Sequence, residues 1–230
     1  GSRAMRAAVG LALAMLFVYL HFEFHRTFGF FYSPLRLPMM TLLWLALCGW
    51  LLYETVVREN PVVTTLLTVF VAGLLAKLFL FDLPSWDVTD RLLYGYTYSF
   101  RDALLRLVDF GAVIGFFTAG YALLAARQRP AHVAVVFGFC GLVLLFIYLT
   151  LEVNSFLDTH VPGLRSGGVS ILWTLFALGL IMRGIRLNVR ALRYPGLALF
   201  AIVAWKVFFV DLAQLDQFYR IIAFIVLGIL

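Results

Sequence analysis

Two histidines and a glutamate stand at the end of the first apolar run of the chain, and all three are residue types that ligate metals. His21, Glu23 and His25 lie in the stretch YLHFEFHRTFGFFYSPLR. On a helix the two histidines would share a face at i and i+4, whereas Glu23 at i+2 would point away from that face. Because no further ligand completes a tetrahedral shell, we predict that this stretch binds no metal and that the histidines turn their polar edges to water.

A second stretch, YLTLEVNSFLDTHVPGLR, repeats the same pattern further along the chain, with Tyr148 at the position of Tyr19. It keeps the glutamate, as Glu152, but has Thr150 and Asn154 at the positions of the two histidines. The same offset continues without a gap, so that AKLFLFDLPSWDVTDR matches WKVFFVDLAQLDQFYR. The charged matches carry the most information, because many different aliphatic residues can replace one another where a helix faces lipid.

Six of the eleven charged positions between residues 15 and 95 are identical in the second copy. They are Glu23 and Glu152, Arg36 and Arg165, Lys77 and Lys206, Asp82 and Asp211, Asp87 and Asp216, and Arg91 and Arg220. A charged group at membrane depth costs roughly 2.5 to 3.5 kcal/mol on insertion scales, so it is normally paired or functional. Two interpretations follow. Either these residues clamp neighbouring helices together, or they line a charged cavity that holds an anionic or zwitterionic group.

The composition indicates which elements position these charges. The chain is 63% hydrophobic and 13% charged, against about 25% charged for a soluble domain. Its recurrent apolar runs of roughly 18 or more residues are each long enough to span a bilayer. We therefore predict an all-α, polytopic bundle of transmembrane helices. Eight spans are expected, at residues 7–21, 37–57, 62–83, 103–126, 131–150, 169–182, 191–212 and 218–230.

These spans divide into two four-helix repeats, residues 1–129 and 130–230. An even number of spans per repeat makes the two repeats parallel, related by a pseudo-two-fold axis along the membrane normal. An amino terminus in the cytoplasm places nine arginines on the cytoplasmic side, as the positive-inside rule requires, and the six matched pairs of charges on the outer side. The net charge of +6 is thereby explained without a nucleic-acid partner.

Both ends of the sequence carry a further expectation. Gly1 and Ser2 resemble a cloning remnant ahead of the native start. The last apolar run has only 13 residues before Leu230, too few to cross a bilayer at about 1.5 Å per residue. We therefore expect the natural chain to continue.

One segment distinguishes the first copy from the second. The stretch VTDRLLYGYTYSFR, residues 88–101, has no counterpart after Gln217. Tyr94, Tyr96 and Tyr98 alternate in it, close to Arg101. Such an aromatic, amphipathic segment is typical of the membrane interface. It forms either a belt there or a lid over a cavity.

Other chemistries find little support in the residues. No nucleophile stands beside a base at a recognisable spacing, and we identify no glycine-rich phosphate loop or redox pair. Cys48 and Cys140 fall in apolar runs and are expected to be buried as small hydrophobic residues. An enzyme that uses Glu23 or Asp82 as a base is left open, but we assign no catalytic residue and no cofactor.

The carboxy-terminal part of the sequence resembles an uncharacterised bacterial family of predicted membrane proteins, domain of unknown function 2339. The resemblance is clear over residues 151–230 and weak over the first copy. It rests on Trp173, Leu192, Arg193, Gly196, Lys206, Asp211, Leu215, Tyr219, Arg220 and Gly228. It implies a location in the bacterial inner membrane, and it implies no activity. Family members are usually longer, which implies that this chain is an excised or minimal unit.

Three roles are compatible with these residues. The first is a non-enzymatic one, in which an outward-facing charged site recognises a polar envelope component such as an anionic lipid headgroup or a glycan precursor. The second is an assembly module, whose retained charges serve folding and whose outer face docks other envelope proteins. The third is a secondary transporter. It would be favoured by interrupted helices at matched positions, but Pro195–Gly196 corresponds to Leu66–Leu67, so the first copy lacks such an interruption.

Overall fold

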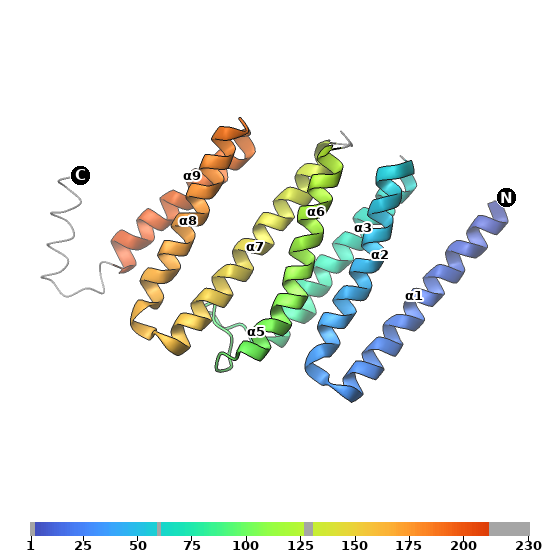
Figure 1. Cartoon of the computed structure of the whole chain (residues 1–230), viewed down its shortest axis with the longest axis horizontal. Helices are drawn as coiled ribbons and strands as arrows, with labels where there is room; N and C mark the ends of the chain where they lie inside the picture. Colours follow the sequence, from blue (N-terminus) through green and yellow to red (C-terminus); the bar gives the residue numbers. More distant parts are fainter. Residues whose placement is uncertain (1–2, 59–60, 127–130, 212–230) are drawn as a thin grey trace, which may run out of the picture. The chain divides into compact units, whose positions relative to one another are not determined.

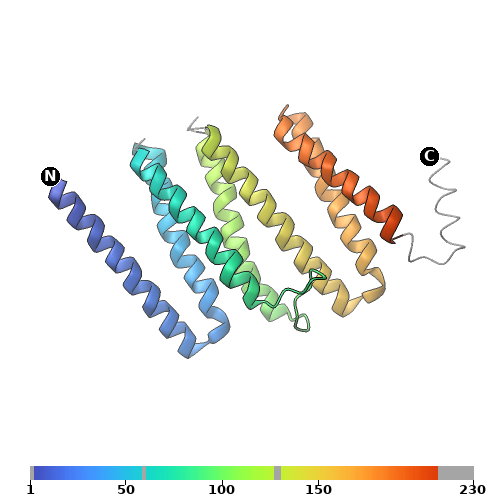
Figure 2. The same ribbon diagram turned by 180° about the vertical axis from the view of Figure 1, so that it is seen from behind.

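The computed structural model describes residues 3–58, 61–126 and 131–211. Within these ranges the chain forms helices, short turns and one longer loop, and contains no β-strand (Figures 1 and 2). The chain divides into two compact units. Unit 1 comprises Gly1–Thr89 and Tyr94–Tyr148, and unit 2 comprises Asp90–Leu93 and Leu149–Leu230.

Several helices continue into one another and form longer rods. The elements before residue 130 are α1 (Arg3–Phe31), η1 (Ser33–Leu35), α2 (Arg36–Arg58), α3 (Pro61–Lys77), η2 (Leu78–Asp82), α4 (Leu83–Ser85), α5 (Phe100–Arg106), η3 (Leu107–Gly111) and α6 (Ala112–Ala126). Those after it are α7 (Ala131–His160), η4 (Pro162–Leu164), α8 (Arg165–Arg186), α9 (Arg190–Lys206) and η5 (Val207–Asp211). The segments η2, η3 and η5 are single π-helical turns, whereas η1 and η4 are 3₁₀ turns.

Helix boundaries recur with the same offset that separates Tyr19 from Tyr148 in the sequence match. This offset relates η1 to η4, the start of α2 to the start of α8, and the whole of α3 with η2 to the whole of α9 with η5. A proline stands in the first turn of both η1 and η4, where its fixed φ suits the start of a helix. Equivalent sequences thus begin and end helices at equivalent residues.

Six helical segments of the described residues are long and apolar enough to cross a membrane. They are Ser33–Val57, Pro61–Ser85, Phe100–Ala126, Val133–His160, Pro162–Arg186 and Leu192–Asp211. The expected span at residues 7–21 lies within α1, which is not among these six, and the one at 218–230 lies outside the described residues. The expected boundaries at 131–150 and 169–182 were too narrow, because α7 continues to His160 and α8 begins at Arg165. Both helices therefore contain polar residues that lie between the two expected spans.

Helix α2 is central to unit 1, since it packs against α1, α3 and α6. The core around it includes Cys48, Leu74 and Phe117, all fully buried. The amino-terminal half of α7 completes this core, because Phe137 packs on Phe117 with ring centroids 5.2 Å apart. Cys48 therefore lies where its sequence context placed it, as an apolar core residue.

Unit 2 is organised around the hairpin of α8 and α9. Asn188, two residues after the end of α8, has a left-handed backbone with φ of 52°. The amide of Val189 donates to the carbonyl of Gly184 at 2.9 Å. This is the Schellman arrangement that closes a helix and reverses the chain. Glycine at position 196 then brings α9 close to α8, because a Cβ there would lie 2.8 Å from Ile181 Cγ1.

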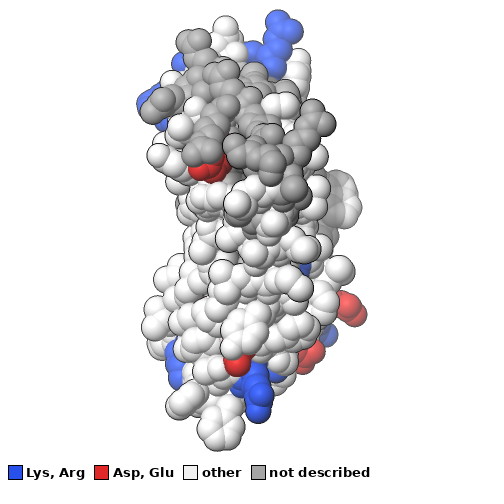
Figure 3. Space-filling view, turned by 90° about the vertical axis from the view of Figure 1, so that its right-hand side faces the viewer, with Lys and Arg blue, Asp and Glu red and all other residues white. Residues whose placement is uncertain are grey.

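The charged side chains visible in Figure 3 gather mainly toward the ends of the helices. Uncharged side chains cover most of the surface between them on that face. Large hydrophobic residues such as Leu80, Phe81 and Leu104 are also exposed. Large hydrophobic side chains exposed on long apolar helices are expected where helices contact lipid.

Candidate functional site

Lys77 and Asp82 form a buried ion pair in unit 1. Lys77 Nζ lies 2.8 and 2.6 Å from the two carboxylate oxygens of Asp82, whose side chain is fully buried. The same ammonium donates to Thr41 Oγ1 at 2.6 Å and to the carbonyl of Leu37 at 3.2 Å, both on α2. The pair therefore ties the end of α3 to the start of α2.

A π turn brings these two charges together. Residues five apart on an α-helix point about 140° away from each other. The hydrogen bonds of a π-helix instead run from i to i+5, and η2 inserts one such turn directly after Lys77. Lys77 and Asp82 consequently share a face.

Unit 2 contains a second cluster of the same design. Lys206 Nζ lies 2.8 Å from Asp211 Oδ1 across the π turn η5. It donates to Ser170 Oγ at 2.6 Å and to the carbonyl of Ser166 at 3.3 Å. The two serine hydroxyls also donate to the two oxygens of Asp211. The contacts of Lys206 have their equivalents in the first copy, at Lys77, Asp82, Thr41 and Leu37.

The two clusters differ in their surroundings. The side chains of Lys206 and Asp211 are 20% and 16% exposed, against 9% and 0% for Lys77 and Asp82. The cluster of unit 1 also contains a second carboxyl group, because Thr41 Oγ1 lies 2.5 Å from Asp109 Oδ1. Asp109 is fully buried in η3, and its Oδ2 has no hydrogen-bond partner among the described residues.

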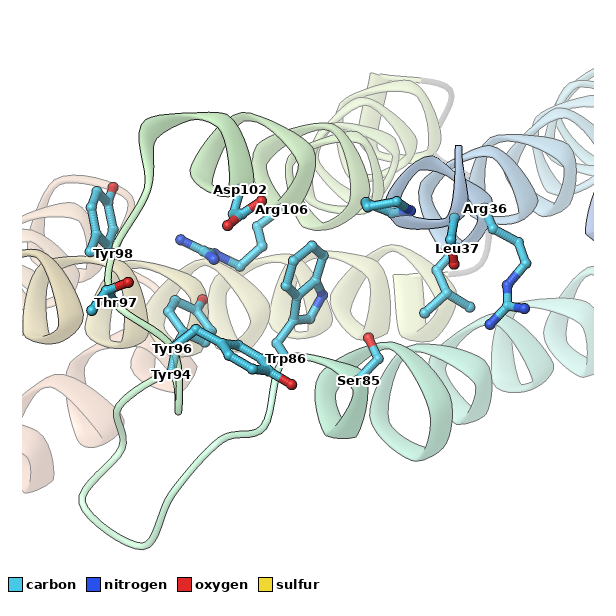
Figure 4. A pocket seen from close by; sticks show the side chains of 12 residues that line it. Arg36, Leu37, Ser85, Trp86, Tyr94, Tyr96, Thr97, Tyr98, Asp102 and Arg106 are labelled. Carbon is cyan, nitrogen blue, oxygen red and sulfur yellow. The ribbon is translucent and has the colours of Figure 1, made fainter. Parts of the chain in front are cut away.

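A cavity of about 310 Å³ adjoins the cluster of unit 1 (Figure 4). Leu37 belongs to both, since it lines the cavity and its carbonyl accepts from Lys77. The other lining residues come from η1, α2, α4, α5 and the loop before α5: Ser33, Pro34, Arg36, Ser85, Trp86, Tyr94, Tyr96, Thr97, Tyr98, Asp102 and Arg106. The tyrosine-rich segment that distinguishes the first copy thus forms one wall.

Arg106 organises this wall. Its guanidinium carbon lies 3.9 Å from the ring centroid of Tyr94, 5.4 Å from that of Trp86 and 5.5 Å from that of Tyr98. Cation–π contacts at these distances are favourable, and more so when water is excluded. Arg106 is only 3% exposed, so the loop is held against α5 by a buried cation among three rings.

Two residues that line the cavity each have a buried hydrogen-bond donor without a partner in the described part of the chain. The donors are Arg36 Nε and Trp86 Nε1. Buried donors in folded proteins are satisfied in the great majority of cases. These two residues are therefore the ones in the cavity wall whose donors are left for a ligand to satisfy.

The equivalent of Arg36 in unit 2 has its acceptors within the protein. Arg165 Nε donates to Asn154 Oδ1 at 2.9 Å, and its Nη1 lies 3.2 Å from Asp158 Oδ1. The residues of the first copy at these two acceptor positions are His25 and Gly29. His25 thus replaces the amide whose oxygen accepts from Nε in unit 2, and Gly29 replaces the carboxylate that pairs with Nη1.

Of the twelve residues predicted as a charge cluster, the structure brings together two pairs. Lys77 with Asp82, and Lys206 with Asp211, are brought together, each pair within its own unit. Glu23 accepts a long 3.4 Å hydrogen bond from Tyr19.

The remaining predicted residues lie in different settings. Asp87 is exposed, with its Oδ2 next to Gly95. The exposed Arg91 contributes its carbonyl, which accepts from Asn154 and Arg165 in unit 2. Glu152 is buried on α7, and Asp216 and Arg220 lie outside the described residues.

The histidine stretch contains no metal-ligand cluster. Among the described residues no group of three or more His, Cys, Asp or Glu side chains could hold a metal ion. His21 instead packs edge-on against Trp44, with ring centroids 6.4 Å apart. At the equivalent place in unit 2, Trp173 Nε1 donates to Thr150 Oγ1 at 3.1 Å.

Four functional candidates were not predicted from the sequence. Asp109 and Arg106 were not singled out, although both are charged residues inside an expected span, which is itself a signal. Thr41 and Ser170 were overlooked because hydroxyl groups are common in membrane helices, and only the contacts with the lysines distinguish them.

Comparison with known proteins gives one match. The family model described as "Predicted membrane protein (DUF2339)" matches residues 2–230. It covers essentially the whole chain, including the first copy, and not only the segment 151–230 that carried the resemblance. Neither a curated protein nor a solved structure matches the chain.

Proposed function

The chain belongs to the DUF2339 family of predicted membrane proteins, and on that premise we propose that the cavity of unit 1 binds the anionic headgroup of an envelope amphiphile. The ligand is a phosphate-bearing lipid or a lipid-linked glycan precursor. The role is recognition or handling of this molecule and not its chemical conversion, because no nucleophile or catalytic base is assigned to the cavity.

The two unpartnered donors carry this proposal. Arg36 and Trp86 line the same cavity, and Arg36 Nε and Trp86 Nε1 are buried without a partner among the described residues, so an anionic headgroup in the cavity would lie beside both side chains. Hydrogen bonds from arginine to phosphate are charge-assisted and roughly twice as strong as neutral ones. The divergence between Arg36 and Arg165 supports the same conclusion, since among the described residues Arg165 Nε has a protein acceptor and Arg36 Nε has none.

The rest of the lining suits a polar headgroup that carries a sugar or polyol. Trp86, Tyr94 and Tyr98 present aromatic surfaces, and Asp102 adds an acceptor for hydroxyl groups. The volume of about 310 Å³ is at the lower end of ligand pockets. It accommodates a headgroup while the apolar chains of the amphiphile remain in the bilayer.

We place this site on the outer side of a bacterial inner membrane. The amino terminus is then cytoplasmic, and the arginines at the turn between α8 and α9, such as Arg183 and Arg190, face the cytoplasm as the positive-inside rule requires. The tyrosine-rich loop acts as the lid over the cavity and not as a separate aromatic belt.

The lysine–aspartate clusters support a second role, that of an assembly module. We propose that the chain is a duplicated eight-span protein, with repeats at residues 1–129 and 130–230, in which these clusters are helix clamps. Lys77 and Asp82 are buried and mutually paired, as expected of a clamp and not of an anion site. In this second role the outer face docks other envelope proteins.

Binding titrations with matched variants test the proposal. The probes are short-chain phosphatidylglycerol, phosphatidylcholine of equal chain length, and a polyprenyl phosphate, each titrated into the detergent-solubilised protein. Preference for phosphatidylglycerol identifies a lipid headgroup, and preference for the polyprenyl phosphate identifies a glycan carrier.

Arg36→Gln should weaken binding by about 10- to 100-fold, the equivalent of one charged hydrogen bond. Arg165→Gln is the matched control at the equivalent position of unit 2 and should leave the affinity unchanged. Unaltered affinity in Arg36→Gln, or an equal loss in Arg165→Gln, contradicts the proposal.

A further inference from the structure

The cluster of unit 1 has one more acid than base. It combines Lys77 with two carboxyl groups, Asp82 and Asp109, which both contact Thr41. Both aspartates are fully buried. With both acids ionised the cluster would carry a net negative charge inside an apolar core, which is unfavourable unless a further positive charge is bound.

The hydrogen-bond partners of Thr41 also indicate that the two acids are not both ionised. A hydroxyl group donates one hydrogen bond and accepts two. Around Thr41 Oγ1 stand one obligate donor, Lys77, and three oxygens: the carbonyl of Leu37 at 3.2 Å, Asp82 Oδ2 at 3.3 Å and Asp109 Oδ1 at 2.5 Å. If both acids were ionised, three acceptors would compete for the single hydroxyl hydrogen. If one acid is protonated it becomes a donor, and the hydroxyl then accepts twice and donates once.

We propose that Asp109 holds a proton in the folded protein and donates it to Thr41 Oγ1. The choice between the two acids follows from their partners, because Asp82 receives the ammonium of Lys77 on both oxygens. Asp109 contacts the cluster through one oxygen only, and its Oδ2 is buried without a partner among the described residues. The ligand of this site is a proton and not a metal cation, since a cation would require several oxygens around Oδ2.

The proton site lies next to the anion site and uses different side chains. Asp109 is one helical turn from Arg106, whose side chain lines the cavity, and Thr41 is one turn from Leu37, which also lines it. The cluster of unit 2 contains no such second acid among the described residues, and there the two serines supply the hydroxyl hydrogens that Asp211 accepts.

Infrared spectroscopy of the purified protein tests this inference directly. A protonated carboxyl group has a C=O stretching band that is distinct from the carboxylate bands and shifts on isotopic labelling of aspartate. We expect such a band at neutral pH in the unaltered protein and in Arg36→Gln, and its loss in Asp109→Asn. Absence of the band from the unaltered protein, or its persistence in Asp109→Asn, overturns the inference.

Two variants distinguish loss of the proton from failure of the protein to fold. Asp109→Asn should fold, because the amide can donate to Thr41 Oγ1 in place of the proton, and its Tm should lie within a few degrees of the parent. Thr41→Val should retain the band at a higher frequency, since the carboxyl proton loses its acceptor. A band that is unchanged in Thr41→Val contradicts the assignment even if Asp109→Asn does not fold.

Discussion

Replacing Lys77 by methionine removes the positive charge of the buried cluster and preserves most of the side-chain length. In Lys77→Met the carboxylate of Asp82 stays fully buried and keeps only the 3.3 Å contact from Thr41 Oγ1. Breaking a buried ion pair on one side costs about 3 to 5 kcal/mol, because an uncompensated charge remains. We expect a loss of unfolding free energy of that size.

Lys206→Met is the matched variant in unit 2, and we expect it to be milder. Asp211 is partly exposed and retains hydrogen bonds from Ser166 and Ser170. These contacts and water compensate part of the lost charge, so the expected cost is about 1 to 2 kcal/mol. The predicted order, Lys77→Met worse than Lys206→Met, follows from the deeper burial and poorer hydrogen bonding of Asp82.

Thermal unfolding in mild detergent measures both effects. At about 2 to 4 °C per kcal/mol for a chain of this size, Tm should fall by about 6 to 20 °C in Lys77→Met and by about 2 to 8 °C in Lys206→Met. The double variant Lys77→Met/Asp82→Leu should recover most of the loss, because no charge is then left unpaired. Unchanged Tm in both single variants refutes the clamp.

Two further pairs of variants test helix packing in the same assay. Gly196→Ala should cost about 1 to 3 kcal/mol, since its Cβ would lie 2.8 Å from a side-chain carbon of α8. Gly179→Ala, whose Cβ meets nothing within 4 Å, should gain up to about 1 kcal/mol of helix stability, and an equal loss in both contradicts the packing. Trp173→Phe should cost about 1 kcal/mol more than Trp44→Phe, because only Trp173 donates a hydrogen bond, to Thr150, within the described residues. A larger loss in Trp44→Phe would show that ring packing and not this bond decides stability.

The helical class could be predicted from the sequence, because long apolar runs have few alternatives in a bilayer. The sequence match between the two copies also located equivalent helix ends, which depend on local residues such as Pro34 and Pro162. The boundaries of the spans were harder to predict from the sequence. Polar residues near Asn154 and Asp158 suggested a loop, yet α7 continues through them because Arg165 contacts both.

The π turns could not be predicted from apolar periodicity, since a single widened turn leaves the surrounding pattern nearly unchanged. Their indirect signal is the spacing of Lys77 and Asp82, and of Lys206 and Asp211, because charges five residues apart share a face only across such a turn. The cavity could not be predicted from the sequence either. It depends on the loop that brings Trp86 to the side of α2 containing Arg36, and no residue pattern specifies that path.

The central claim is that unit 1 holds an anionic amphiphile at Arg36, and native mass spectrometry of the mildly extracted protein tests it most directly. We predict a discrete retained mass in the unaltered protein and in Lys206→Met. The same mass should be lost in Arg36→Gln. Bare protein in every sample, or equal retention in Arg36→Gln, would contradict the claim and leave the assembly role as the better account.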